Sequence, residues 1–208
     1  MTSEMTHRWA EGWSVSRGTA APVVTQWGLR IEVGAANQLR RHVLLDPSEP
    51  GVRELVAGID EPLTWIKSHV EPSELAPWLP AGWTEDIPGW LMAIDVAPAA
   101  VALPDGYTLS SESKEGVTYI RIHTFDGELA ARGQYGYVGD HGTVDQIETE
   151  PAHRRRGLGS VVMNALANAA DELGASTSVL GATVEGRALY EAMGWKVHAP
   201  LAGFVYRR

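Results

Sequence analysis

Alternating hydrophobic and polar positions mark the second half of the chain and predict a run of strands there. Residues 117–124 alternate along their length, and the Asp126-Gly127 pair that follows is typical of a hairpin turn. The chain should then return as a strand over 128–138, turn at 139–142, and form a third strand over 143–149. Hairpin connections of this kind predict antiparallel pairing.

The pattern changes to a helical period after residue 157. Apolar residues spaced along one stripe predict a helix over 157–173. They are Leu158, Val162, Leu166, Ala169 and Leu173. A short strand over 178–181, a short helix over 186–193 and one or two closing strands over 196–206 follow. Because a strand–helix–strand unit needs a crossover connection, the sheet should contain parallel pairing, and the fold class is α/β in the broad sense that includes α+β.

The first half of the chain is less regular, but its apolar segments also predict strands and short helices. The expected strands cover 23–33, 42–45, 63–70 and 90–96. A helix over 50–59 should begin at Ser48 as its N-cap, and the Pro- and Trp-rich segment 71–88 should form one or two helical turns.

Residues 97–104 separate two regions that differ in composition. This segment has no clear period and is bracketed by Pro98 and Pro104. Seven of the eight tryptophans fall before residue 91. We therefore expect an N-terminal α/β region over 1–104 and a second region over 105–208.

Composition and charge exclude several classes of protein. The 208 residues contain no cysteine, which removes disulfide frameworks, thiolate metal sites and cysteine nucleophiles. A formal net charge of -9 argues against a nucleic-acid partner, because duplex binding usually requires a basic surface. Residues 1–20 do not have the pattern of a signal peptide, and no apolar run is long enough to span a membrane. We expect a cytoplasmic protein without membrane contact.

The segment that says most about chemistry lies between the third strand and the long helix. Residues 149–160 read TEPAHRRRGLGS, so a basic, glycine-rich loop leads into a helix start. Backbone N–H groups converge at a helix start, the helix dipole favours negative charge there, and glycines let a phosphate approach closely. The sequence thus predicts an anion site suited to a pyrophosphate. The lysine of a P-loop and the third glycine of a dinucleotide fingerprint are absent.

Two motifs in this region resemble the GNAT superfamily of acyl-CoA-dependent N-acyltransferases. The Arg-x-x-Gly-x-Gly signature stands here as Arg154-Arg155-Arg156-Gly157-Leu158-Gly159. Residues 186–195, GRALYEAMGW, are similar to the second motif of the superfamily, usually Leu-Tyr, three residues, then Gly-Phe. The resemblance covers about residues 105–208. It implies a mixed, mostly antiparallel sheet flanked by helices, with the N-terminal region packed against it as the acceptor side or as a degenerate GNAT-like half.

The resemblance also implies which residues bind the cofactor, acetyl-CoA or another acyl-CoA. Backbone amides of 154–160 should hold the pyrophosphate, and the strand backbone at Ile147 and Thr149 should bind the pantetheine arm. Thr183 stands where the superfamily often has an asparagine, seven residues before Tyr190. The expected cofactor-binding residues are Ile147, Thr149, Arg154, Arg155, Arg156, Gly157, Leu158, Gly159, Ser160 and Thr183.

Two side chains are candidates for catalysis. In the superfamily a tyrosine at the place of Tyr190 lies near the CoA sulfur and acts as general acid. Alternation places Asp145 on the strand face of Ile147 and Thr149, where it could take the acceptor's proton, and Glu148 on the opposite face. An ion pair or a solvent contact is an equally good interpretation for both carboxylates, because a water relay and positioning can replace a protein base.

The superfamily normally carries two helices between its first and second strands, and they usually help to line the acceptor pocket. Here 107–110 is the expected first strand, and only a few residues separate it from Val117. The region 1–104 must supply those helices, or they are absent.

These features predict an N-acyltransferase that moves acetyl from acetyl-CoA to a primary amine by direct attack. No metal is expected, since His123, His141 and His153 lack metal-ligand spacing. The acceptor is a small-molecule or peptide amine of open identity, and homodimer formation is open as well. The alternative is a catalytically silent acyl-CoA sensor, which would bind acetyl-CoA and release no thiol with any amine.

Overall fold

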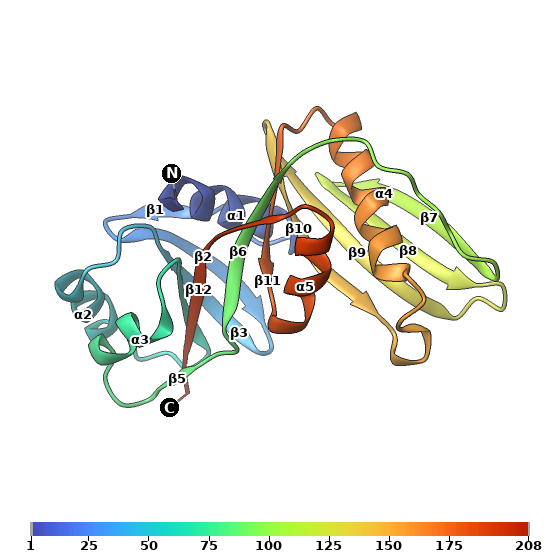
Figure 1. Cartoon of the computed structure of the whole chain (residues 1–208). Coiled ribbons are helices and arrows are strands. Elements are labelled where there is room, and N and C mark those ends of the chain that lie inside the picture. The colour runs from blue at the N-terminus through green and yellow to red at the C-terminus, as the bar shows by residue number, and fades with distance from the viewer. Residues whose placement is uncertain (1, 208) are drawn as a thin grey trace.

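The computed structural model describes residues 2–207 and shows one continuous sheet that runs through both regions of the chain (Figure 1). Its strands lie in the order β1-β2-β3-β4-β12-β6-β11-β10-β9-β8-β7, and β5 also pairs with β12. Within the described residues the only parallel pairs are β3–β4 and β10–β11. The mixed, mostly antiparallel sheet predicted from the sequence is therefore confirmed.

The C-terminal region follows the predicted order closely. Four strands form an antiparallel meander, α4 crosses over the sheet, and β11 returns parallel to β10. Leu158, Val162 and Leu166 of the predicted helical stripe are buried. The elements are β7 (Tyr107–Lys114), β8 (Val117–Thr124), β9 (Leu129–Val138), β10 (His141–Thr149), α4 (Leu158–Glu172), β11 (Thr177–Ala182), α5 (Val184–Ala192) and β12 (Lys196–Tyr206).

The N-terminal region contains a smaller unit of the same kind, β3–α2–β4, whose strands are again parallel. Ser48 caps α2 as predicted and accepts a hydrogen bond from the Gly51 amide at 3.4 Å. The elements are α1 (Thr2–Ser16), β1 (Val23–Thr25), β2 (Gly28–Ala35), β3 (Gln38–Leu44), α2 (Glu49–Ala57), β4 (Thr64–Ser68), α3 (Pro72–Leu75), η1 (Ala76–Trp78), β5 (Trp83–Glu85) and β6 (Gly89–Asp95).

The last strand of each region pairs with strands of the other. β6, from the N-terminal region, lies between β11 and β12, and Figure 1 shows it beside β12 at the centre of the molecule. β12 continues past β6 and pairs with β4 over Ala202–Val205. Each region therefore completes the sheet of the other.

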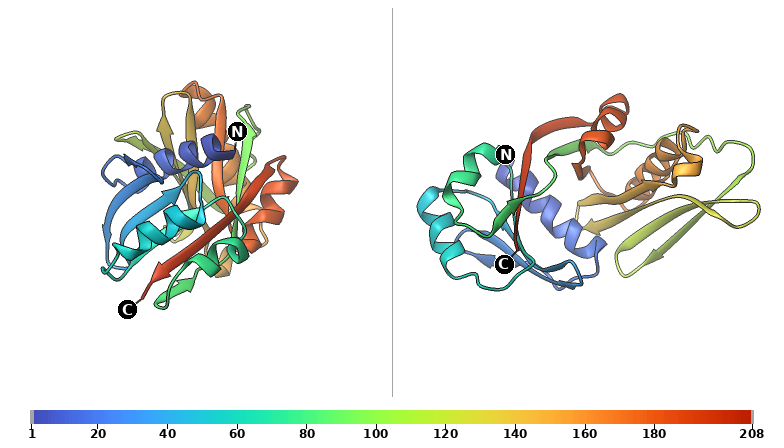
Figure 2. Two further views of the ribbon diagram at one scale, coloured as in Figure 1. Left: turned by 90° about the vertical axis from the view of Figure 1, so that its left-hand side faces the viewer. Right: turned by 90° about the horizontal axis from the view of Figure 1, so that it is seen from below.

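Helix α1 lies in the angle between the two parts of the sheet (Figure 2). Trp9 and Trp13 are 4% and 5% exposed and pack in one cluster with residues of β2, β3, β6, β11 and β12. The sequence predicts no element over 2–16. The reason is that several of the positions α1 buries are glycine or polar, so no apolar stripe marks the helix. They are Thr6, Gly12, Ser14 and Ser16.

A glycine contact brings α1 against the C-terminal region. A Cβ added at Gly12 would lie 2.8 Å from the backbone nitrogen of Thr143, and Gly136 of β9 faces the same turn of α1. Side chains of the sheet then bond to the helix backbone: Thr143 Oγ1 donates to the Trp9 carbonyl at 3.1 Å, and Gln134 donates to Ser16. α1 is thus fixed on β9 and β10 by a fit that leaves no room for a side chain at Gly12.

Replacing Gly12 by alanine should therefore destabilise the protein, although the same change inside an ordinary helix stabilises by about 0.5–1 kcal/mol. We expect Gly12→Ala to lower the free energy of unfolding by about 1–3 kcal/mol, the usual effect of overpacking. Denaturant unfolding measures the change. Gly51→Ala in α2 is the matched control, because its Cβ would meet only Ser48 Oγ at 3.2 Å. Equal stability of the two variants would contradict the close fit of α1.

The two helices that the superfamily normally carries between its first and second strands are absent here. β7 and β8 form a direct hairpin, with Lys114 opposite Val117, so no helix lies between them. Along β9, Gly133 faces α4 whereas Gly136 faces α1. α1 thus covers the side of the sheet opposite α4. None of the helices within residues 2–207 is long and apolar enough to cross a membrane.

Candidate functional site

The sheet opens between β10 and β11. The two strands pair only over His141–Thr143 and Thr177–Val179, after which β11 continues beside β6 alone. β10 also carries a bulge, since its register with β9 shifts between Asp145 and Glu148, and Gln146 has a φ of 53°. Beyond the short paired stretch, the backbone of β10 therefore borders an opening.

The bulge changes which side chains share a face, and the alternation expected for this strand is wrong. Ile147 packs with the core under α4, whereas Asp145 points to the opposite face and binds α1. Glu148 shares the face of Asp145, because its partner Arg132 lies two residues from Gln134, which also binds α1. The bulge adds one residue to the strand, so Asp145 falls on the face of Glu148 and not on that of Ile147.

A cleft of about 760 Å³ follows this opening from the bulge to the first turn of α4. It is lined by nine of the ten residues that the sequence assigns to cofactor binding, and by Tyr190. They are Ile147, Thr149, Arg154, Arg155, Gly157, Leu158, Gly159, Ser160, Thr183 and Tyr190. Glu148, Glu185, Gly186 and Leu189 complete the lining. The sequence offered a signal for Gly186 and Leu189, which stand in the second motif, but not for Glu185.

Two expected site residues do not line the cleft. The guanidinium of Arg156 donates to the Tyr107 hydroxyl at 2.9 Å and to the Ala152 carbonyl at 3.3 Å. It therefore fixes the loop to β7. Asp145 lies on the far face of β10, against α1.

The start of α4 has the features of an anion site. Gly157, the N-cap residue, has a φ of 79° and provides no side-chain cap, so the first amides of the helix have no side-chain acceptor. A Cβ added at Gly157 would meet no atom within 4 Å, whereas one at Gly159 would lie 3.3 Å from Leu189 Cδ2. Unpaired amides, the positive end of the helix dipole and the exposed Arg154 and Arg155 all favour a negative ligand. The site fits a pyrophosphate.

Helix α5 forms the opposite wall of the cleft. Thr183 caps this helix and accepts a hydrogen bond from the Gly186 amide at 3.2 Å. Gly186 in turn leaves room for Tyr190, since a Cβ there would lie 2.9 Å from Tyr190 Cε2 and 3.3 Å from the hydroxyl. The small residue of the second motif is thus required by the tyrosine one turn later.

Tyr190 is held as a neutral phenol at the edge of the cleft. The residue is 8% exposed, and its ring packs on Trp195 with centroids 6.2 Å apart. Burial, followed by the charge of Asp145, raises the pKa of Tyr190 to about 12. Tyr190 therefore keeps its proton at neutral pH and can donate it.

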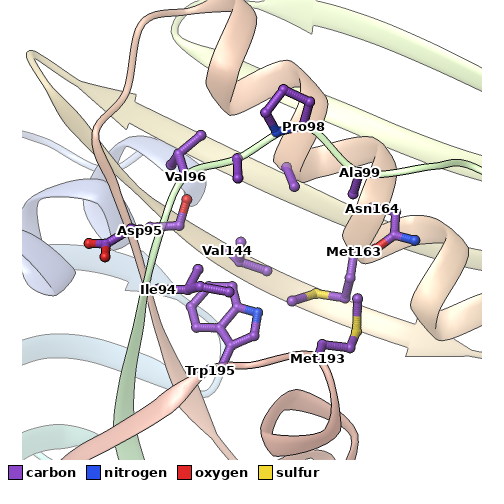
Figure 3. A pocket seen from close by; sticks show the side chains of 13 residues that line it. Ile94, Asp95, Val96, Pro98, Ala99, Val144, Met163, Asn164, Met193 and Trp195 are labelled. Carbon is purple, nitrogen blue, oxygen red and sulfur yellow. The ribbon is translucent and has the colours of Figure 1, made fainter.

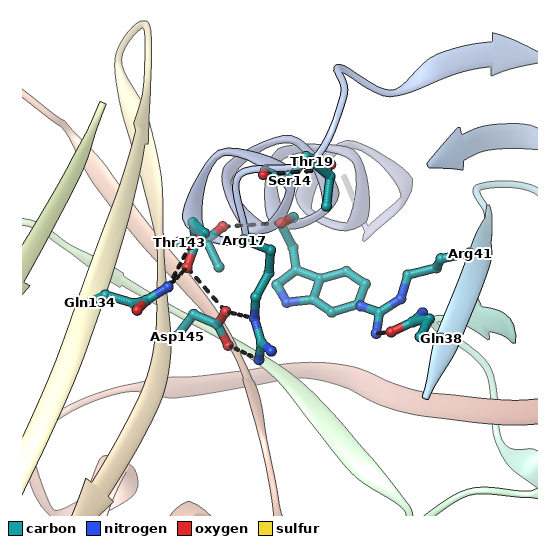
Figure 4. A network of polar contacts seen from close by, with 10 residues as sticks. Ser14, Arg17, Thr19, Gln38, Arg41, Gln134, Thr143 and Asp145 are labelled. Atoms are coloured by element: carbon teal, nitrogen blue, oxygen red, sulfur yellow. Dashed lines mark hydrogen bonds and ion pairs between the residues drawn. The ribbon is translucent and has the colours of Figure 1, made fainter. Parts of the chain in front are cut away.

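Both candidate carboxylates are already paired. Asp145 accepts hydrogen bonds from Ser16 Oγ at 3.0 Å and from Arg17 Nη2 at 3.0 Å, and Figure 4 shows Arg17 reaching it from the end of α1. Glu148 accepts from Arg132 at 2.7 Å. An amine that approaches Asp145 must therefore replace Arg17.

A second, apolar cavity of about 230 Å³ lies between β6, α4 and the end of α5 (Figure 3). Val144, Met163, Met193 and Trp195 line it. Trp195 lies between this cavity and Tyr190, and the cavity shares no lining residue with the cleft. Within the described residues the two spaces are thus separate.

The N-terminal unit does not repeat the opening. β3 and β4 stay paired from Arg40–Thr64 to Leu44–Ser68, so the strands do not part. The loop before α2 carries Asp46, the first turn of the helix carries Glu49, and neither contains an arginine. A pantetheine arm would find no gap here, and the loop would repel a phosphate.

Comparison with known families agrees with this geometry. A family model described as "Acetyltransferase (GNAT) family" matches residues 82–195, more than half of the chain. A search among curated proteins found no match.

Several solved structures share the fold. A GCN5-related N-acetyltransferase from Kribbella flavida is 17% identical, with a TM-score of 0.70 over 99% of this chain and 95% of that one. A protein assigned to the GNAT family from Novosphingobium aromaticivorans is 16% identical, with a TM-score of 0.61 over 95% of this chain and 97% of that one. A tandem GNAT protein from the clavulanic acid biosynthesis pathway is 13% identical, with a TM-score of 0.56 over 74% and 66%.

Proposed function

Because the chain belongs to the GNAT acetyltransferase family, we propose that it transfers acetyl from acetyl-CoA to a primary amine by direct attack on the thioester. One observation carries the proposal. A single cleft joins an anion site at the start of α4 to a buried, neutral tyrosine at its other side. A donor with a pyrophosphate at one end and a thioester at the other fits such a cleft.

The residues of the chain have distinct parts in this reaction. Acyl-CoA supplies the activated acyl group. Gly157 and the amides after it bind the pyrophosphate, and the β10 bulge, where Gln146 and Ile147 have no partner on β9, presents backbone N–H groups that can polarise the acyl carbonyl. The amine passes its proton to water, since both nearby carboxylates are paired with arginines, and Tyr190 donates a proton to the leaving sulfur. Holding the amine and the thioester together in the opening supplies a further part of the rate enhancement.

The separate apolar cavity supports a short acyl group. A long chain bound beyond Tyr190 would need a passage into that cavity, and the two spaces have no residue in common. Acetyl needs no such passage.

Release of free thiol from acetyl-CoA in the presence of a panel of amines tests the proposal. Thiol that appears only with an amine, together with the N-acetylated product, would support it. A silent acyl-CoA sensor would bind acetyl-CoA stoichiometrically and release no thiol with any amine, and that result would overturn the proposed transfer.

Replacing Gly157 by aspartate should abolish acetyl-CoA binding and leave the fold intact. At an effective dielectric constant of 20, a carboxylate about 4 Å from a phosphate charge costs about 4 kcal/mol, so affinity should fall about 1,000-fold. Calorimetry with acetyl-CoA measures this. Gly174→Asp is the matched control, because it lies just past the other end of α4 with the same φ of 79° and equally open space. Equal affinity in both variants would contradict the cofactor site.

A further inference from the structure

The apolar cavity of about 230 Å³ lies where the two regions of the chain meet (Figure 3). Ile94 of β6 and the linker that follows it form one wall. Met163 of α4 and Trp195, between α5 and β12, form the others. Ligand pockets occur preferentially at such junctions between regions.

The linker that covers the cavity is bound to α4 and held away from the opposite wall. Asn168 bonds both backbone groups of Ala99, at 2.7 Å from the amide and 2.9 Å from the carbonyl, and Asn164 donates to the Ala100 carbonyl at 2.8 Å. These bonds oppose a shift of the linker that would close the space. An unfilled void of this size is unfavourable, because the atoms that line it lose packing contacts. A ligand restores those contacts.

The side chains that line the cavity favour an aromatic ligand. Met163 and Met193 direct their thioethers toward the space, and Trp195 places its indole beside it (Figure 3). Methionine sulfur makes favourable contacts with aromatic rings, and an indole packs well against another ring. Because thioether side chains are flexible, they adapt to rings of different outline.

The lining offers no partner to a charged ligand. Among the described residues that line the cavity, Asp95 is the only ionisable one, and Figure 3 shows its carboxylate pointing away from the space. The buried hydroxyl of Ser178 already donates to the Tyr135 hydroxyl at 3.2 Å. An ion that entered would lose its hydration without gaining a compensating bond.

Size and access limit the ligand further. Ala97 and Pro98 of the lining are exposed, so the cavity reaches the surface beside the linker. An apolar cavity of about 150 Å³ is known to bind benzene. The larger space here, about 230 Å³, therefore has room for one ring or two fused rings.

We propose that this cavity is a binding site for a small, uncharged aromatic molecule of one ring or two fused rings. The site is separate from the acyl-CoA cleft, since the two spaces share no lining residue, and the inference does not depend on the proposed acyl transfer. A ligand that binds only the folded protein stabilises it by mass action, so an occupied cavity should raise the melting temperature.

Methyl NMR of protein labelled at its methionines tests the site, with benzene and indole as probes. The methyl resonances of Met163 and Met193 should shift as either probe is added. The methyl of Met5, which packs in the cluster around α1, should not. Benzoate carries the ring of benzene with a carboxylate attached and should bind at least about 10-fold more weakly than benzene.

Replacing Ala167 of α4 by leucine places a larger side chain in the cavity. Ala167→Leu should weaken indole binding at least about 10-fold, because the ring atoms that it displaces lose apolar burial. Ala169→Leu is the matched control, since Ala169 is two residues further along the same helix, is similarly half-buried and does not line the cavity. It should bind indole as the wild type does, and circular dichroism checks that both variants fold.

Unchanged indole affinity in folded Ala167→Leu would overturn the inference. The wild-type spectra decide it without any variant: methyl resonances of Met163 and Met193 that stay in place with both probes, up to the limit of their solubility, would also overturn it. Benzoate that binds as tightly as benzene would contradict the assignment to uncharged ligands.

Discussion

A fragment that begins at Leu103 should neither fold nor bind acetyl-CoA, although it contains every cofactor-binding residue. The cut removes β6, which lies between β11 and β12. Met92 and Leu91 of β6 are fully buried and belong to two different cores, one under α4 and one around α1. Without this strand both cores are open, and β11 and β12 lose the neighbour that joins them. Circular dichroism and calorimetry with acetyl-CoA measure the loss.

Co-expression of 1–102 with 103–208 provides the control. The cut leaves intact the contacts that bind the linker to α4, where Asn168 bonds both backbone groups of Ala99 and Asn164 donates to the Ala100 carbonyl at 2.8 Å. The two pieces should therefore reassemble and bind acetyl-CoA. The intact chain should unfold in one cooperative transition. If the isolated C-terminal fragment folds and binds acetyl-CoA as well as the whole chain, the N-terminal region is a separable domain.

The sequence predicts best those elements whose buried residues recur with the period of a strand or a helix. The boundaries of β8 agree with the alternation of 117–124, and α4 differs by one residue at each end from the helix expected over 157–173. Their apolar residues recur at the spacing of a strand or a helix, and each segment buries one face. The loop motif before α4 also predicts its function as an anion site, because a run of arginines and glycines at a helix start has few structural uses.

Long-range arrangement could not be predicted in the same way. α1 buries Gly12 and Ser16 in a close backbone fit, and such positions do not stand out as apolar. β6 and β12 each pair with strands of the other region. The residues of a strand do not specify which strands will lie beside it, so the sequence does not predict this arrangement. Simple alternation assigns Asp145 to the wrong face of β10, because one bulge residue, Gln146, shifts the alternation. The pairing of Asp145 with Arg17 joins residues 128 positions apart in the sequence, so only the structure shows it.

Replacing Tyr190 by phenylalanine should lower kcat by about 10²–10⁴-fold, the usual range for a general acid, with little change in acetyl-CoA affinity. The hydroxyl is the only group removed, and the ring can still pack on Trp195. Single-turnover measurements isolate the chemical step. Tyr135→Phe is the matched control: Tyr135 is also buried, its pKa is likewise raised to about 12, and it lies outside the cleft. Loss of its bond with Ser178 should lower stability by about 0.5–1.5 kcal/mol and leave kcat unchanged.

The pH profile of the wild-type enzyme tests the same role in a second way. An acid must be protonated to act, and burial raises the pKa of Tyr190 to about 12, so kcat should not fall between about pH 7 and pH 10. Above about pH 10 the unfolded chain begins to ionise its tyrosines while the folded chain holds Tyr190 neutral, so stability declines there and the profile should end at that point. A fall in kcat centred well below pH 10 would show that another group is the acid. Wild-type kcat in Tyr190→Phe, with chemistry rate-limiting, would show that the phenol only packs.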